Sequence, residues 1–109
     1  MRTLRFIVKN QTIKQDPNCD FSGLVPGSEG YLQAEFVLSP EWKNMAVVAS
    51  FWSNMGTEYP PQILGNTRTC AIPVDALKKK IFKVQLIGKD EHGTRLITNK
   101  VAVSQNGGN

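Results

Sequence analysis

The sequence has no long hydrophobic run, and it contains only two cysteines and one histidine. No stretch approaches the ~18 consecutive apolar residues of a membrane span. Arg5 and Lys9 fall where a signal peptide would need an uninterrupted apolar centre. Cys19 and Cys70 are too few for a disulfide scaffold, so we expect free thiols. These features predict an intracellular protein with no export signal of its own and no membrane partner.

Catalytic motifs are also scarce. The single histidine, His92, stands in DEHGT, which has the composition of a solvated hairpin tip. The candidates for a glycosidase pair follow no spacing that would place two carboxylates in one cleft: Glu29, Glu35, Glu41 and Glu58. The sequence has no phosphate-binding glycine loop, no zinc-ligand spacing and no cofactor signature. We therefore expect a protein that is not an enzyme, with no catalytic residues, metal or cofactor.

The densest cluster of ligand-type side chains is DPNCD, at residues 16–20. Asp16, Asn18 and Asp20 match the first three ligand positions of a calcium-binding loop. The diagnostic sixth and twelfth positions hold Phe21 and Gly27 in place of glycine and glutamate. We therefore interpret the cluster as consecutive turns in which these side chains accept local backbone N–H bonds. The cysteine among them is expected to be a small buried group, since no basic residue beside it would activate the thiol.

Short segments with strand-like patterns dominate the chain. With 109 residues and 40% apolar content, the chain has the size of one domain with one core. Its net charge of +4 permits weak attraction to polyanions without requiring it. Candidate strands, most with apolar residues at alternate positions, are residues 3–9, 11–15, 31–38, 45–52, 58–64, 67–72, 81–88 and 95–103. Segment 45–52 is apolar on both faces, as in a central strand or in a strand covered by a loop or another subunit.

Two proline-led segments interrupt this pattern. SPEW at residues 39–42 and PVDAL at residues 73–77 each predict a single helical turn, which directs Trp42 and Leu77 into the core. The combined pattern predicts an all-β fold: a single antiparallel β-sandwich, Ig-like or jelly-roll-like, of about seven to eight short strands with two proline-led helical turns. We expect the sandwich to span residues 1–104 and a flexible C-terminal tail to occupy residues 105–109.

An aromatic, proline-rich edge is the first candidate for interaction. It comprises Trp52, Tyr59, Pro60 and Pro61. The two prolines cannot both donate to a sheet, so segment 58–64 is expected at a sheet edge. The aromatic rings would form either a subunit contact or a platform for sugar, if they are not simply packed in the core.

A basic patch is the second candidate. It comprises Lys78, Lys79, Lys80 and Lys83. Such a run either binds nucleic acid or serves as a solvated guard against edge pairing. Alternation places Phe82 on the side opposite Lys83, so the aromatic ring is expected in the core and not against a base. We therefore favour the second role, in which the solvated lysines prevent unintended pairing at a sheet edge.

The order of five motifs adds a resemblance: FVLSPEW, AVVASFW, CAIPVDAL, FKVQLIG and RLITNKVAV. Together, over residues 30–103, they resemble a loosely defined group of small proteins and N-terminal modules encoded in phage and prophage tail regions of Gram-positive bacteria. The resemblance implies a β-sandwich virion component of tail-tip or baseplate assemblies, made in the host cytoplasm. Members of that group are sometimes joined to receptor-binding domains. No collagen-like, coiled-coil or lectin domain follows in this sequence, so direct host recognition is not expected.

The leading prediction is a non-enzymatic phage or prophage structural or assembly module, associated with the tail or baseplate, that works by protein–protein interaction. Its partners would be other virion proteins or further copies of itself in a homo-oligomer, with the edge at Trp52 and Tyr59 as the interface. Two alternatives stay open. One is a carbohydrate-binding module for cell-wall glycans. The other is a basic accessory protein that binds a host factor or, as the less favoured partner, nucleic acid.

Overall fold

A computed structural model describes residues 1–106, and it confirms the predicted all-β sandwich. The described residues form nine strands: β1 (Arg2–Lys9), β2 (Thr12–Gln15), β3 (Leu32–Leu38), β4 (Ala46–Ser53), β5 (Gln62–Ile63), β6 (Thr69–Ala71), β7 (Ile81–Lys89), β8 (Arg95–Ile97) and β9 (Val101–Ser104). Both proline-led turns are also present, as a 3-10 turn at Pro40–Trp42 and as the single-turn helix α1 (Val74–Leu77). The sequence patterns therefore predicted the types of these elements correctly.

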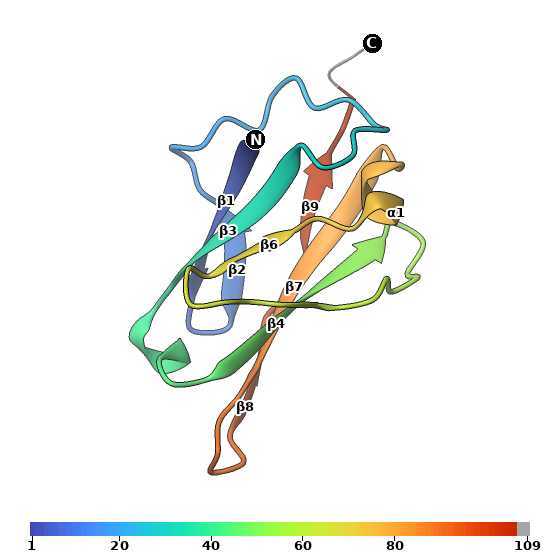
Figure 1. The fold of residues 1–109 in the computed structure, drawn as a ribbon. Coiled ribbons are helices and arrows are strands. Elements are labelled where there is room, and N and C mark those ends of the chain that lie inside the picture. Colours follow the sequence, from blue (N-terminus) through green and yellow to red (C-terminus); the bar gives the residue numbers. More distant parts are fainter. Residues whose placement is uncertain (107–109) are drawn as a thin grey trace.

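The strands form two sheets that pack against each other (Figure 1). Sheet A has the order β2-β1-β3-β6, and sheet B has the order β5-β4-β7-β8, with β9 pairing with the other half of β7. Apolar residues alternate along the strands, so inward side chains such as Phe6 of sheet A and Leu86 of sheet B fill one core between the sheets. The outward side chains form two surfaces, which we call face A and face B after their sheets.

The expectation of a purely antiparallel sandwich is wrong in sheet A, where β1 and β3 run parallel. Arg2 stands beside Leu32 in this register, and the Arg2 N–H donates to the Tyr31 carbonyl at 2.7 Å. The cause is the irregular segment after β2, residues 16–31, which returns the chain to the beginning of β1. Parallel neighbours need a crossover of about a dozen residues or more, and this segment supplies it.

The last predicted strand, residues 95–103, is divided into β8 and β9 at Thr98. The Thr98 hydroxyl accepts the Leu86 N–H at 3.0 Å, so a side chain replaces the backbone at one position of the ladder. The Asn99 side chain meanwhile reaches β2, where its Oδ1 accepts the Ile13 N–H at 2.8 Å and its Nδ2 donates to the Ile13 carbonyl at 3.2 Å. The break therefore lets one amide side chain join the edge of sheet A to the edge of sheet B.

Trp42 lies in the core, as predicted. Its side chain is fully buried, and the indole Nε1–H donates to the Asn10 carbonyl at 2.8 Å. The ring packs directly on Gly88 of β7, where an added Cβ would lie 2.8 Å from the ring. Glycine at this strand position therefore provides the space that Trp42 occupies.

The folded domain extends past the predicted boundary at residue 104. Gln105 is fully buried, and its Nε2 donates to the carbonyls of Leu77 and Lys79 at 3.0 and 2.9 Å. These carbonyls lie at the end of a one-turn helix, where backbone acceptors lack partners within the helix. Gln105 is thus part of the fold and not of a tail, whereas residues 107–109 of the predicted tail lie outside the described residues.

Candidate functional site

The predicted aromatic edge lies on β4 and on the segment that runs beside it. Glu58 forms a bridge with Trp52, and the Tyr59 N–H donates to the Phe51 carbonyl at 2.8 Å. Side chains alternate along an extended chain, so Trp52 points to face B whereas Tyr59 packs against the core. Both side chains are partly buried. The structure therefore does not bring the two aromatic rings together on one surface.

Pro60 and Pro61 are exposed and lead into β5, which is the edge strand of sheet B. The prediction that this segment lies at a sheet edge is confirmed. Neither proline has a backbone N–H to offer to a further strand, so the pair protects this edge from unintended pairing.

Lysine side chains surround Trp52 on face B. Lys100 Nζ lies 3.5 Å from the centroid of the indole ring, and Lys83 stands beside Trp52 in the β4–β7 register. A cation over an aromatic ring contributes roughly 0.5–1 kcal/mol at an exposed site. An ammonium group therefore occupies a ring surface on which a sugar or a base would otherwise stack.

A row of aliphatic side chains crosses face B at right angles to the strands. Ile63 of β5 stands beside Val48 of β4. Val48 in turn stands beside Ile87 of β7, which stands beside Ile97 of β8. Ile63 is 82% exposed and the other three are partly exposed. With strands ~4.8 Å apart, this aliphatic row of four residues is about 14 Å long.

Sequence reasoning did not identify the aliphatic row, although part of the signal was present. The apolar character of segment 45–52 on both faces indicated an outer surface in need of cover. Which outward residues become neighbours depends on the register between strands that are distant in sequence. No single segment contains that information.

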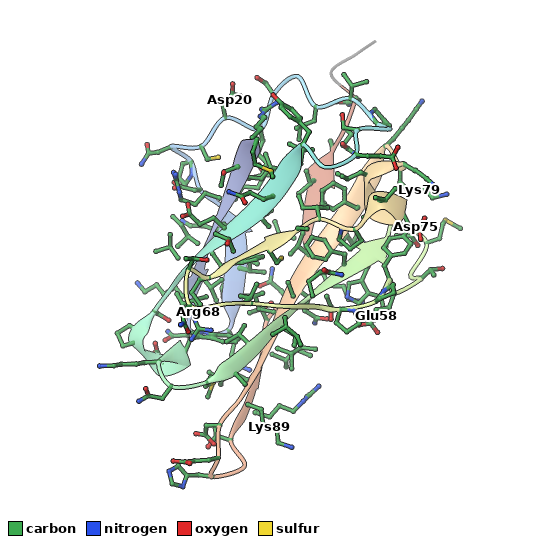
Figure 2. The ribbon with its side chains drawn as sticks, in the orientation of Figure 1. Asp20, Glu58, Arg68, Asp75, Lys79 and Lys89 are labelled. Carbon is green, nitrogen blue, oxygen red and sulfur yellow. The ribbon has the colours of Figure 1, made fainter. Side chains whose placement is uncertain are left out.

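The charged residues around the aliphatic row are mainly cationic. Lys89 and Arg95 are register partners on one side of the row, and Lys83 and Lys100 lie on the other side. Three carboxylates lie nearby: Glu58 beside Trp52 at the β4 edge, well apart from Lys89 (Figure 2), and Asp90 and Glu91 in the β7–β8 hairpin, where they line a hollow together with Lys89. None of the four cations forms a salt bridge within residues 1–106.

Two buried polar atoms of face B also have no hydrogen-bond partner within residues 1–106. They are Ser50 Oγ and Trp52 Nε1, which lie two positions apart on β4. A buried donor without a partner costs roughly 1–3 kcal/mol, so such atoms are uncommon. Face B therefore combines exposed apolar side chains, unpaired cations and unused hydrogen-bond donors.

The structure divides the predicted basic patch. Lys78 ends the α1 turn and forms an exposed ion pair with Asp75 at 3.6 Å. Lys79 and Lys80 line a cavity of about 480 Å³ together with Tyr59. Figure 2 shows Lys79 and Asp75 at the same corner of the molecule, beside α1.

The fourth lysine of the patch, Lys83, lies on face B, where it stands beside Trp52. Phe82 is fully buried, as predicted, and is therefore not available for base stacking. The four lysines of the predicted patch thus have three different surroundings: an ion pair, a cavity and face B.

Turns account for much of the DPNCD cluster. The Asn18 N–H donates to Asp16 Oδ1 at 2.9 Å, and the Ser22 N–H donates to Asp20 Oδ1 at 2.8 Å. Asp16 and Asp20 accept local bonds as predicted, whereas Asn18 acts through its own N–H as a donor. Hydrogen bonds from Ser22 lower the pKa of the Asp20 carboxyl. Within the part of the chain that is described, no group of three or more His, Cys, Asp or Glu is placed to hold a metal ion.

Cys19 and Cys70 are free thiols, as expected. Cys19 Sγ accepts the Arg5 N–H at 3.3 Å and donates to the Thr3 carbonyl at 3.6 Å, so it continues the pairing along β1. Burial raises the pKa of the Cys70 thiol to about 12, which keeps it protonated and unreactive near neutral pH.

His92 is exposed in the β7–β8 turn, as its sequence context predicted.

Polar side chains on face A, in contrast, satisfy one another. Arg5 Nε donates to Glu35 Oε1 at 2.7 Å, and Arg5 Nη1 lies 3.5 Å from Asp16 Oδ2. The hydrogen bond to Glu35 is the main reason that the pKa of the Arg5 guanidinium is raised. Gln33 Nε2 also donates to Thr3 Oγ1 at 2.9 Å. The polar groups at the centre of face A therefore have partners within the protein.

No family model, curated protein or solved structure matches this chain. Among residues 1–106, no helix is long and apolar enough to cross a membrane.

Proposed function

We propose that this protein is a non-enzymatic phage or prophage structural or assembly module, associated with the tail or baseplate, that acts through protein–protein contact at face B. The aliphatic row is the observation that supports this proposal most directly. Soluble monomers rarely expose large contiguous apolar patches, and neighbouring aliphatic side chains gathered on one face are typical of interaction sites. Trp52 lies on the same face, and tryptophan is enriched at protein interfaces.

The carbohydrate alternative has less support than protein contact. A sugar platform needs accessible aromatic rings on one surface. Trp52 and Tyr59 lie on different surfaces, and Lys100 lies against the Trp52 ring. Nucleic-acid binding through the predicted basic patch also has less support, because its lysines are distributed over separate sites.

Site-specific photo-cross-linking in the cells that produce the protein tests the proposal. One variant has p-benzoylphenylalanine in place of Ile63, on face B. The matched control has it in place of Val37, an aliphatic residue of β3 on face A that is 50% exposed. We expect discrete protein adducts from position 63 and none from position 37, with mass spectrometry identifying the partner.

Three outcomes separate the parts of the proposal. Adducts with tail or baseplate proteins support the whole of it. Adducts with unrelated proteins support an interaction module and contradict the phage assignment. Absence of adducts at position 63, or equal labelling from both positions, contradicts the role of face B.

A further inference from the structure

We infer that face B binds an acidic protein segment whose apolar side chains pack on the aliphatic row. This inference rests on the proposed function and adds the chemistry of the partner. It follows from three independent features of face B: the shape of the apolar surface, the sign of the surrounding charge and the unused hydrogen-bond donors.

The aliphatic row determines what the centre of the partner must be. Branched aliphatic side chains offer dispersion contacts and apolar area, and they form no hydrogen bond to a polar ligand. An extended segment with apolar residues at every second position places three of them over about 14 Å, which equals the length of the row. Ile63 is at the edge-strand end and is 82% exposed, so this end of the row is open to a partner.

The cations of face B indicate which charged groups the partner must have on both sides of its apolar residues. Cations lie on both sides of the row, with Lys89 and Arg95 on one side and Lys83 and Lys100 on the other. Carboxylates on both sides of the partner's apolar residues would pair with them. A second copy of the chain would instead bring the same excess of positive charge against itself, so charge complementarity favours an acidic partner over self-association.

Hydrogen-bonding capacity agrees with an acidic partner. Ser50 Oγ and Trp52 Nε1 are both donors without acceptors within residues 1–106. Lys100 lies over Trp52, and a partner carboxylate can draw its ammonium group away from the ring. Both donor atoms are buried in the free protein, so side chains of face B would have to shift before carboxylate or carbonyl oxygens of the partner could accept from them.

A nucleic acid would use the cations but not the rest of the surface. Its phosphates would pair with lysine and arginine, whereas the aliphatic row would be left against a polar backbone. Bases bind by stacking on aromatic rings, and the Trp52 ring is covered by Lys100. The surface therefore favours an acidic protein segment.

Three capped synthetic peptides test the inference: EIEVEIE, its basic counterpart KIKVKIK, and the acidic peptide without apolar residues, ESESESE. Binding of each labelled peptide to the full chain is measured by fluorescence anisotropy at low and at high salt. We expect EIEVEIE to bind at least tenfold more tightly than either of the others, and its affinity to fall as salt screens the lysines.

Paired variants locate the binding. Charge reversal of Lys83 and Lys100 to Glu should weaken EIEVEIE binding at least tenfold. The matched control reverses Lys78 and Lys79 to Glu, which changes the net charge equally but away from face B, and it should weaken binding less than threefold. If the first variant fails to fold by circular dichroism, Lys89→Glu with Arg95→Glu tests the other side of the row. Ile63→Ser should weaken EIEVEIE binding by severalfold.

The outcomes distinguish failure of the inference from failure of the proposed function. Equal binding of EIEVEIE and KIKVKIK, both lost in Ile63→Ser, would overturn the acidic partner and leave protein contact at face B in place. A concentration-dependent dimer by light scattering that Ile63→Ser disrupts would assign the surface to a second copy and overturn the inference. Competition by an oligothymidine that is lost with Lys83→Glu and Lys100→Glu would assign it to nucleic acid, also against the inference. No peptide binding together with no cross-linking at position 63 would overturn both proposals.

Discussion

The two outer faces of the sandwich are built on the same alternation of side chains, but they differ in how their polar groups are satisfied. On face A, Arg5 lies between Glu35 and Asp16 and contacts both. On face B, four cations have no ion pair within residues 1–106, and an aliphatic row lies between them. Face A also has two cations without a salt bridge within residues 1–106, Lys9 and Lys14, and the exposed Val37, but the charged groups at its centre are paired with one another. Face B has no such pairing: its cations and its exposed aliphatic side chains lie together without internal partners, which is the combination expected of a surface that binds a partner.

The two tryptophans give the largest expected contrast, between the core and face B. Trp42→Ala should lower the free energy of unfolding by about 3–5 kcal/mol, because the fully buried ring packs on Gly88. Trp52→Ala should lower it by only about 1 kcal/mol, mainly through loss of the Lys100 contact and part of the ring's packing. Urea unfolding followed by circular dichroism measures both. Similar losses would identify Trp52 as a core residue and remove it from face B.

A substitution at Asn99 tests whether the stability of the protein depends on the hydrogen bonds that the Asn99 side chain makes at the β2 edge of sheet A. Asn99→Ala should lower the free energy of unfolding by about 1–2 kcal/mol, because the N–H and carbonyl of Ile13 lose both of their partners. The matched control is Asn66→Ala, at an exposed turn position, where a change of no more than about 0.5 kcal/mol is expected. If the two substitutions destabilise the protein equally, the Asn99 side chain does not hold the two sheets together.

Removal of one cation from each face compares the two surfaces directly. Arg5→Met should lower stability, because Glu35 and Asp16 lose their shared partner, and the effect should shrink as salt concentration rises. Lys83→Met should leave stability unchanged, since Lys83 forms no salt bridge within the described chain. Denaturant midpoints at two salt concentrations measure both effects. A larger loss of stability from Lys83→Met than from Arg5→Met would contradict the view that only the cation of face A has partners within the protein.

The smallest expected effect concerns the β7–β8 hairpin at the end of face B. Asp90 Oδ1 accepts the N–H groups of Thr94 and His92, each at 2.9 Å, and these bonds lower the pKa of Asp90. A depressed carboxyl pKa stabilises the fold at pH values above the unfolded pKa of about 3.9 and loses that stabilisation as pH falls through the folded value.

Unfolding measured from pH 7 to pH 2 tests this linkage. The wild type should lose stability over the acidic range more steeply than Asp90→Asn. Glu91→Gln, at the exposed neighbouring position, should follow the wild-type profile. Parallel profiles for wild type and Asp90→Asn would show that the turn bonds do not favour the ionised form.

The element types could be predicted because they depend on local patterns. Alternating apolar residues identified the strands, and proline at the first position of a turn identified SPEW and PVDAL. The division at Thr98 escaped prediction because a threonine hydroxyl that replaces a backbone acceptor has no signal in the apolar pattern, although the register shifts by one residue between the pairs Ile87–Ile97 and Val84–Val101. The parallel pairing of β1 and β3 depends on the path of an irregular segment, which has no periodic pattern.

The candidate site could be predicted only in part, for the same reason. Trp52 was placed on an interaction surface from its own strand pattern, and that role stays a prediction. Its grouping with Tyr59 ignored the register of the segment after β4, which places successive side chains on opposite sides. The aliphatic row comes from four strands that are separated in sequence, and its cations come from two of these strands and from the segment between β8 and β9, so they become a surface only in the folded chain.

The isoleucine methyl spectrum of the labelled protein tests the central claim most directly, because isoleucines report on both faces at once. Ile63, Ile87 and Ile97 lie on face B, and Ile7 lies on face A. Titration with EIEVEIE, or with the partner identified by cross-linking, should shift the methyl signals of Ile63, Ile87 and Ile97 and leave that of Ile7 in place. Shifts of Ile7 with unchanged Ile63, Ile87 and Ile97 would contradict the assignment of face B as the binding surface.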